Sequence, residues 1–98
     1  MEITSELINK AKLARRMTTD AYDSQVTDLL GAAALDLGIA GVEIPEESSL
    51  LVEQAMITFF LMRFGEPDNY ETLKRSYDEQ KAQLSMYTGY TDWGDIDG

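Results

Sequence analysis

The segment 50–64, LLVEQAMITFFLMRF, constrains the fold more than any other part of the chain. Polar residues interrupt it at four positions only, and at 100° per residue its apolar side chains leave no clean polar face on a helix. Such a helix is roughly 22 Å long and too short for a membrane span of about 20 apolar residues, so we predict a buried helix. A small bundle can hardly cover it on all sides. We therefore expect Met56 and Phe60 to pack against another subunit.

Helical periodicity recurs in three other segments of the chain. They cover residues 4–16, 21–37 and 69–87, and each has one apolar stripe for the central helix. Thr4 or Ser5 can cap the first helix, Gly38 can end the second, and Gly65 with Pro67 ends the apolar helix. The pattern predicts an all-α fold: a small four-helix bundle over residues 1–87, with a flexible acidic tail over residues 88–98.

The tail has the sequence TGYTDWGDIDG, in which three glycines and three aspartates disfavour a packed element. Aromatic residues nevertheless lie within and just before it, at Tyr87, Tyr90 and Trp93. Aromatic anchors in a flexible acidic segment are typical of a chain end that orders on a partner. We predict that these three residues dock on such a partner; the alternative is that Trp93 folds back onto the bundle.

The charge of the chain is unevenly distributed. Residues 1–16 hold four basic and two acidic residues, which is +2, and the remainder holds four basic and sixteen acidic residues, which is −12. A basic end on an acidic body suits head-to-tail self-association, with Lys12, Arg15 and Arg16 at the subunit interface. The alternative is an ordinary solvated surface. Either way, the net charge of −10 disfavours binding to the phosphate backbone of nucleic acid.

Catalytic chemistry has little support in this sequence. The chain has no Cys, which excludes disulfides and Cys-based zinc sites, and no His, the commonest general base. The adjacent carboxylates of Glu46 and Glu47 lie in a Pro/Ser-containing connector, and the aspartates of the tail lack the spacing of a calcium loop. We predict no catalytic, metal or cofactor site. Residues 1–17 lack the apolar region of a signal peptide, which predicts assembly in the cytosol.

Two other functions fit parts of the sequence. The acidic composition is compatible with a DNA mimic or another inhibitory interaction module, although the carboxylates form no regular double row. Asp23-Ser24-Gln25, at the predicted start of a helix, resembles the Asp-Ser-Leu motif at which acyl carrier proteins attach phosphopantetheine. Gln25 replaces the apolar residue of that motif, and the preceding link is much shorter than the long loop of carriers.

The order of motifs along residues 20–87 resembles the head-tail connector, or DNA-packaging adaptor, proteins of tailed bacteriophages. The most specific part of the resemblance is a Phe-Gly-x-Pro-Asp-Asn turn between an apolar helix and a Tyr/Lys/Leu helix. The first helix carries more charge than the family pattern. The resemblance rests on the segments DAYD (20–23), LGI (37–39), LVEQAMITF (51–59), RFGEPDN (63–69) and YDEQKAQLS (77–85).

This resemblance implies an all-helical subunit that forms a ring beneath the portal of a virion. The ring extends the DNA channel and offers a platform for the stopper or tail-completion protein, so the implied partners are further copies of the chain, the portal and that protein. The family acts by assembly, without catalysis, cofactor or membrane. DNA passes through an acidic channel without specific binding, because like charges repel the duplex from the wall.

Overall fold

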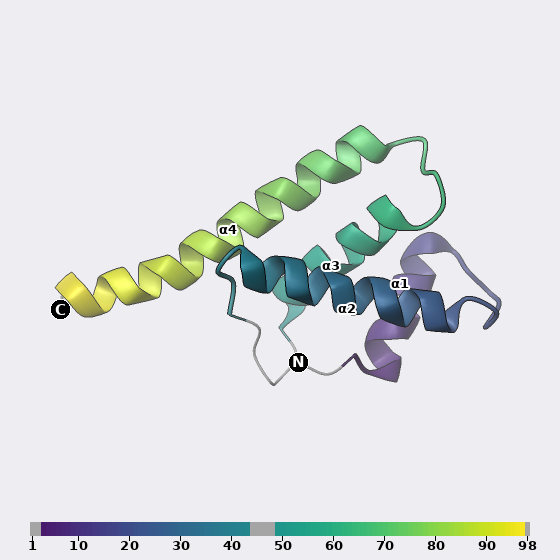
Figure 1. Cartoon of the computed structure of the whole chain (residues 1–98), viewed down its shortest axis with the longest axis horizontal. Helices are drawn as coiled ribbons and strands as arrows, with labels where there is room; N and C mark the ends of the chain where they lie inside the picture. Colours follow the sequence, from purple (N-terminus) through teal and green to yellow (C-terminus); the bar gives the residue numbers. More distant parts are fainter. Residues whose placement is uncertain (1–2, 44–48, 98) are drawn as a thin grey trace.

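The computed structural model describes residues 3–43 and 49–97, with side chains described up to Met86. Within these residues all the regular secondary structure is helical, without a β-strand, which confirms the predicted all-α four-helix fold (Figure 1). The helices are α1 (Ser5–Arg15), α2 (Asp23–Ile39), α3 (Leu50–Arg63) and α4 (Tyr70–Asp97).

Helix α3, the apolar segment, is the centre of the bundle. It packs against α1, α2 and α4, so that helices cover it on three sides. Met56 and Phe60 are both 0% exposed. The prediction that these two residues face another subunit is therefore wrong, because three neighbouring helices already bury them in the core of one chain.

Helix α1 begins as the sequence predicts. The Thr4 Oγ1 atom accepts a hydrogen bond of 3.2 Å from the backbone N–H of Leu7, which satisfies one of the free donors of the first turn. Leu7 and Ala11 are buried, whereas Ala14, three residues further along the helix, is exposed. The helix ends at Arg16, whose left-handed backbone (φ 61°) closes it.

Helix α2 runs past its predicted end at Gly38. The residue that stops it is Gly41, whose φ of 93° is in the left-handed region that glycine adopts without strain. The Val42 N–H donates to the Leu37 carbonyl and the Gly41 N–H to the Gly38 carbonyl, both at 3.0 Å. This pair of hydrogen bonds defines a Schellman motif, and it places Val42 in the core beside Leu37.

The turn between α3 and α4 forms where the sequence places it. Gly65 has a φ of 66°, and the preceding Phe64 packs its ring at 5.2 Å from Phe60 and at 5.7 Å from Tyr22. The turn thus fixes the carboxyl end of α3 against the start of α2.

Helix α4 continues to Asp97, ten residues beyond the predicted end at Tyr87, and its last turns project past the other helices (Figure 1). Gly and Asp weaken a helix by up to about 1 kcal/mol per residue but do not break it as Pro does. No Pro follows Pro67, so nothing in the sequence forbids this extension. The predicted partner-docking role of residues 88–98 stays a prediction.

Candidate functional site

Lys12 is the centre of a polar cluster between α1 and the start of α2. Its Nζ atom lies 2.7 Å from Asp20 Oδ1 and 2.8 Å from Asp23 Oδ1, and its side chain is only 11% exposed. The hydrogen bond with Asp20 raises the pKa of Lys12 and lowers that of Asp20. The prediction that Lys12 projects to a neighbouring subunit is wrong, since two carboxylates of its own chain hold the ammonium group.

A second ion pair joins α1 to α3. Lys10 Nζ lies 2.8 Å from Glu53 Oε1, and the Glu53 side chain is 7% exposed. The pairing explains why a carboxylate is tolerated on the most buried helix of the molecule. Both polar contacts of α1 are therefore internal, and they fix the helix on the bundle.

The basic residues left on the surface of α1 are at its carboxyl end. Arg15 is exposed and places its guanidinium 5.8 Å from the centre of the Phe64 ring. Arg16 is exposed at the helix cap. Leu13, three residues before Arg16, is 75% exposed, and at 100° per residue it lies on the other side of the helix from Arg15. We call Leu13 and Arg16 the α1 patch. The predicted interface role of Arg15 and Arg16 stays a prediction.

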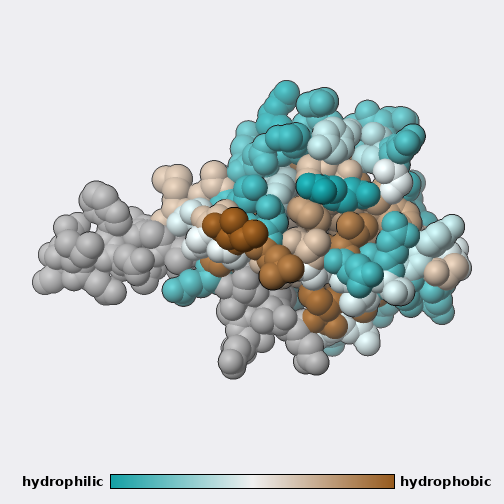
Figure 2. Space-filling model, in the orientation of Figure 1, coloured by the Kyte–Doolittle hydropathy of each residue, from teal (hydrophilic) through white to brown (hydrophobic). Residues whose placement is uncertain are grey.

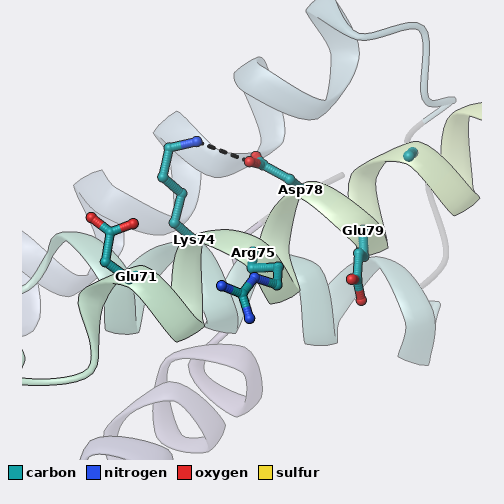
Figure 3. A pocket seen from close by; sticks show the side chains of 6 residues that line it. Glu71, Lys74, Arg75, Asp78 and Glu79 are labelled. Carbon is teal, nitrogen blue, oxygen red and sulfur yellow. Dashed lines mark hydrogen bonds and ion pairs between the residues drawn. The ribbon is translucent and has the colours of Figure 1, made fainter.

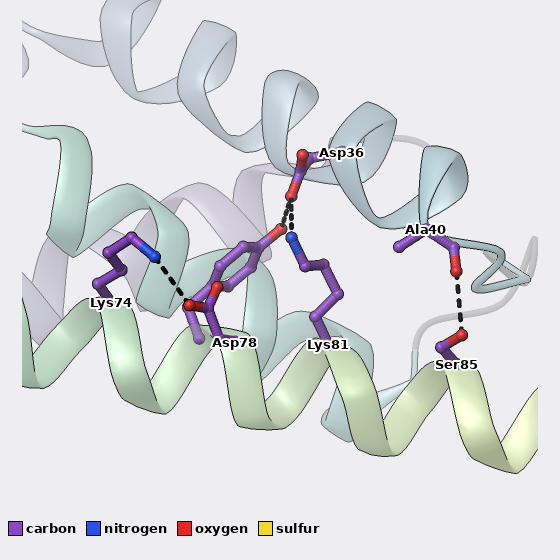
Figure 4. A network of polar contacts seen from close by, with 7 residues as sticks. Asp36, Ala40, Lys74, Asp78, Lys81 and Ser85 are labelled. Atoms are coloured by element: carbon purple, nitrogen blue, oxygen red, sulfur yellow. Dashed lines mark hydrogen bonds and ion pairs between the residues drawn. The ribbon is translucent and has the colours of Figure 1, made fainter.

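Helices α2 and α4 are joined by a second polar cluster, which Figure 4 shows in close-up. The Tyr77 hydroxyl donates to Asp36 Oδ2 at 2.5 Å, and Lys81 Nζ lies 3.2 Å from the same oxygen. Lys81 also lies over the Tyr77 ring at 5.0 Å from its centre. The bond from Tyr77 and the nearby ammonium group of Lys81 lower the pKa of Asp36, whereas burial and the bond to Asp36 raise that of Tyr77.

One further bond ties the same helices together nearer the carboxyl end of α2. The Ser85 hydroxyl donates to the Ala40 carbonyl at 3.0 Å (Figure 4). The contacts between α2 and α4 are thus made by long or polar side chains that reach across. These contacts hold α2 beside α4, and the side of α2 that faces away from α4 stays uncovered by it.

A shallow hollow of about 400 Å³ runs along the outer side of α4 (Figure 3). All its lining residues belong to this single helix, and the ion pair that crosses it joins Lys74 to Asp78 at 2.9 Å. A hollow walled by solvated side chains of one helix lacks the enclosing apolar walls of a small-molecule site.

The exposed side of α2 is apolar over its carboxyl half. Leu35 is 71% and Ile39 is 86% exposed, and Figure 2 shows apolar side chains gathering there. Gly31 and Gly38 lie on the same side, and a Cβ added to either would meet nothing within 4 Å. We call Asp28, Gly31, Leu35, Gly38 and Ile39 the α2 stripe.

Sequence reasoning missed this stripe, although a signal was present. Leu35 and Ile39 are one helical turn apart and lie off the stripe of Val26, Leu30 and Leu37, which all become buried. A helix with apolar residues on both sides has to leave one set uncovered when it lies at the edge of a bundle.

The remaining residues that the sequence singled out are either exposed on the surface or outside the described residues. Ser24 is exposed at the second residue of α2. Glu46 and Glu47, and the side chains of Tyr87, Tyr90 and Trp93, lie outside the described residues. Within the described ranges, no group of His, Cys, Asp and Glu side chains could hold a metal ion. None of the helices described combines the length and the apolar character that crossing a bilayer requires.

Comparison with known proteins gives no relative from which to transfer a function. No protein-family model, no curated protein and no solved structure matches the chain.

Proposed function

We propose that the chain is a head-tail connector subunit of a tailed bacteriophage or prophage. It forms an oligomeric ring under the portal, extends the DNA channel and joins the head to the tail. In this role it works by assembly and contributes no catalytic step. Its place is the virion, after assembly in the host cytoplasm, and its partners are further copies of itself, the portal and a stopper or tail-completion protein.

The observation that carries the proposal is the α2 stripe. The middle of α3 is covered by three helices, and Tyr77, Phe60 and Leu30 are at most 2% exposed, whereas Leu50 and Leu51 at the amino end of α3 are 70% and 66% exposed. Leu35 and Ile39 lie outside the core, and exposed apolar patches can mark protein interaction sites. An assembly subunit needs such a surface.

The order of elements supports the connector class in particular. The Phe-Gly-x-Pro-Asp-Asn motif lies between the buried apolar helix α3 and the Tyr/Lys-containing helix α4, as in the resemblance. In α4 the motif tyrosine Tyr77 and the motif lysine Lys81 both bind Asp36 of α2. These motif residues hold α4 on α2. A structural role of this kind is what a protein that acts by assembly, without catalysis, requires of its motif residues.

The acidic charge fits a channel through which DNA moves. With a net charge of −10, the chain repels the duplex and adds no adhesive contact to phosphate groups. A ring of such subunits lets DNA slide, which packaging and ejection both require.

Imaging with the portal protein of the same phage tests the proposal. Negative-stain class averages of portal alone and of portal with the purified chain should differ by an added ring on the portal axis. Portal particles that gain no density at a large molar excess of the chain would refute the connector function. A monomeric chain in isolation is compatible with it, because the portal can template the ring.

Charge reversal tests the electrostatic part of the proposal. Arg15→Glu with Arg16→Glu should reduce ring formation while the thermal melting of the chain changes little, because both side chains are exposed. Lys74→Glu with Arg75→Glu on the outer side of α4 makes the same change in net charge and serves as the matched control. Equal ring formation by the two double variants would show that the basic end of α1 has no special part in assembly.

A further inference from the structure

We infer that the α2 stripe of one copy binds the α1 patch of a second copy, in a head-to-tail contact. The inference rests on the proposed function in so far as that function requires self-assembly. It goes further by naming the two surfaces that meet and by inferring that they are different surfaces of the two copies.

The α2 stripe is a continuous surface along one side of the helix. At 100° per residue, Asp28, Leu35 and Ile39 lie within about 40° of one another. Leu35 and Ile39 expose more than two thirds of their area. Figure 2 shows apolar side chains on this face of the molecule. The polar end of the stripe is thus at Asp28, and the apolar end is at Ile39.

Two glycines leave the backbone of α2 uncovered by side chains within this surface. Gly31 and Gly38 lie inside α2, where Gly is less favourable than Ala, yet neither has an internal neighbour that a Cβ would touch. The fold of one chain therefore gives no packing reason for the missing side chains. A side chain of a second molecule can therefore contact the backbone of α2 at Gly31 and Gly38, next to Leu35.

The charges indicate which surface of the second copy fits. Residues 17–62 contain no Lys or Arg, and the stripe has exposed Asp28 at its polar end and exposed Glu43 four residues after Ile39 at its apolar end. The α1 patch has the complementary composition: Leu13 is an exposed apolar side chain, and Arg16 is an exposed cation. In the described part of the chain Arg16 makes no ion pair.

The positions of the two surfaces determine the symmetry of the contact. Lys12, next to Leu13, is bound to Asp20 and Asp23 at the amino end of α2, and Ile39 is 16 residues or roughly 24 Å along the helix from Asp23. The patch and the apolar end of the stripe thus lie at opposite ends of α2. A contact between different surfaces at opposite ends repeats from copy to copy and closes as a ring when the rotation permits.

A two-fold contact between two α2 stripes is disfavoured by charge. It would bring Asp28 and Glu43 of both copies together, with no basic residue between positions 17 and 62 to offset them. Like charges across an interface reduce affinity, whereas Arg16 of the α1 patch brings an opposite charge.

Cysteine cross-linking tests the contact directly, because the chain has no cysteine of its own. One sample mixes copies carrying Leu13→Cys with copies carrying Ile39→Cys, and a control sample replaces the second with Ser76→Cys on the exposed side of α4. All three positions are exposed, so the variants should melt like the parent chain. Under mild oxidation we expect several-fold more cross-linked dimer in the first mixture than in the control.

Charge complementation adds a second readout. Arg16→Glu in the Leu13→Cys copies should lower the yield of cross-linked dimer several-fold, and Asp28→Lys with Glu43→Lys in the Ile39→Cys copies should restore it.

Ile39→Cys copies that cross-link with themselves more than with Leu13→Cys copies would overturn the inference, as would a first mixture that yields no more dimer than the control. If the portal still gains a ring in that case, the connector function stands and only this contact fails. If neither occurs, both are refuted.

Discussion

Tyr77→Phe isolates the link between α2 and α4 with the smallest possible change. The Tyr77 side chain is 2% exposed, and its ring packs edge-on against Phe59 at 5.3 Å between centres. Phe keeps this ring and its volume, and only the hydroxyl that donates to Asp36 is lost. The change in the free energy of unfolding therefore reports the bond across the two helices.

The expected size follows from the surroundings of Asp36. A hydrogen bond to a charged group contributes about 1.5–3 kcal/mol, but Asp36 keeps its contact with Lys81, so about 1–2 kcal/mol is expected. The Asp36 side chain is 38% exposed, and water can replace part of the lost bond. In a domain of this size that loss lowers Tm by roughly 5–15 °C.

The same substitution should change the alkaline limit of stability. The pKa of Tyr77 is raised in the folded state by burial and by the bond to Asp36. The folded chain therefore holds this proton more tightly than the unfolded chain does, and the stabilisation is complete below the unfolded pKa of about 10 and is lost as pH rises above it. Tyr77→Phe should remove this part of the alkaline decline, so that the difference from the parent chain narrows above about pH 10.

Thermal unfolding followed by far-UV circular dichroism between pH 7 and pH 11 measures both effects. Tyr70→Phe is the matched control, since Tyr70 is 39% exposed, and it should leave Tm unchanged. A double-mutant cycle with Asp36→Asn should give a coupling of about 1 kcal/mol between the two side chains. A Tyr77→Phe variant as stable as the Tyr70→Phe control, or a coupling near zero, would show that the bond does not hold α2 and α4 together.

Four further substitutions test the packing and the turns. Phe60→Ala should cost about 3–5 kcal/mol in chemical denaturation, because the ring is 0% exposed beneath three helices. Gly41→Ala should cost about 1–2 kcal/mol in the same assay, since its φ of 93° strains any residue with a Cβ. Gly31→Ala should raise Tm through up to about 1 kcal/mol of helix propensity and yet reduce cross-linking to the α1 patch. Lys12→Met should lower Tm at pH 7 and less so at pH 3: the lowered pKa of Asp20 gives stability above about pH 4 that is lost as pH falls.

The sequence predicted best where single residues decide the local structure. The amino end of α1 follows from Thr4, and the end of α3 follows from Gly65 and Pro67, because capping and turn chemistry act over a few residues. Gly38 shows the limit of this reasoning. Either Gly38 or Gly41 can end a helix, and the choice of Gly41 depends on burying Val42, which is a tertiary contact.

The candidate site was harder to predict because exposure depends on neighbours. Lys12 has the sequence context of a solvated basic face, yet the turn after α1 brings Asp20 and Asp23 back to it. Its long alkyl chain can lie on the bundle while the ammonium group meets the two carboxylates. The periodicity of α1 alone contains no information about where the next helix begins.

The position of the surplus apolar surface follows from which helix takes the centre. The sequence predicted a subunit contact at Met56 and Phe60 on the most apolar segment, α3, but this part of the helix is covered because burying it removes the most apolar area from water, and only Leu50 and Leu51 at its amino end stay largely exposed. Helix α2 is nearly as apolar and lies beside it, so one of its sides packs on α3 and the other, with Leu35 and Ile39, remains exposed. This exposed apolar side is where we propose that a second copy binds, and the acidic residues around it favour a basic surface on that copy.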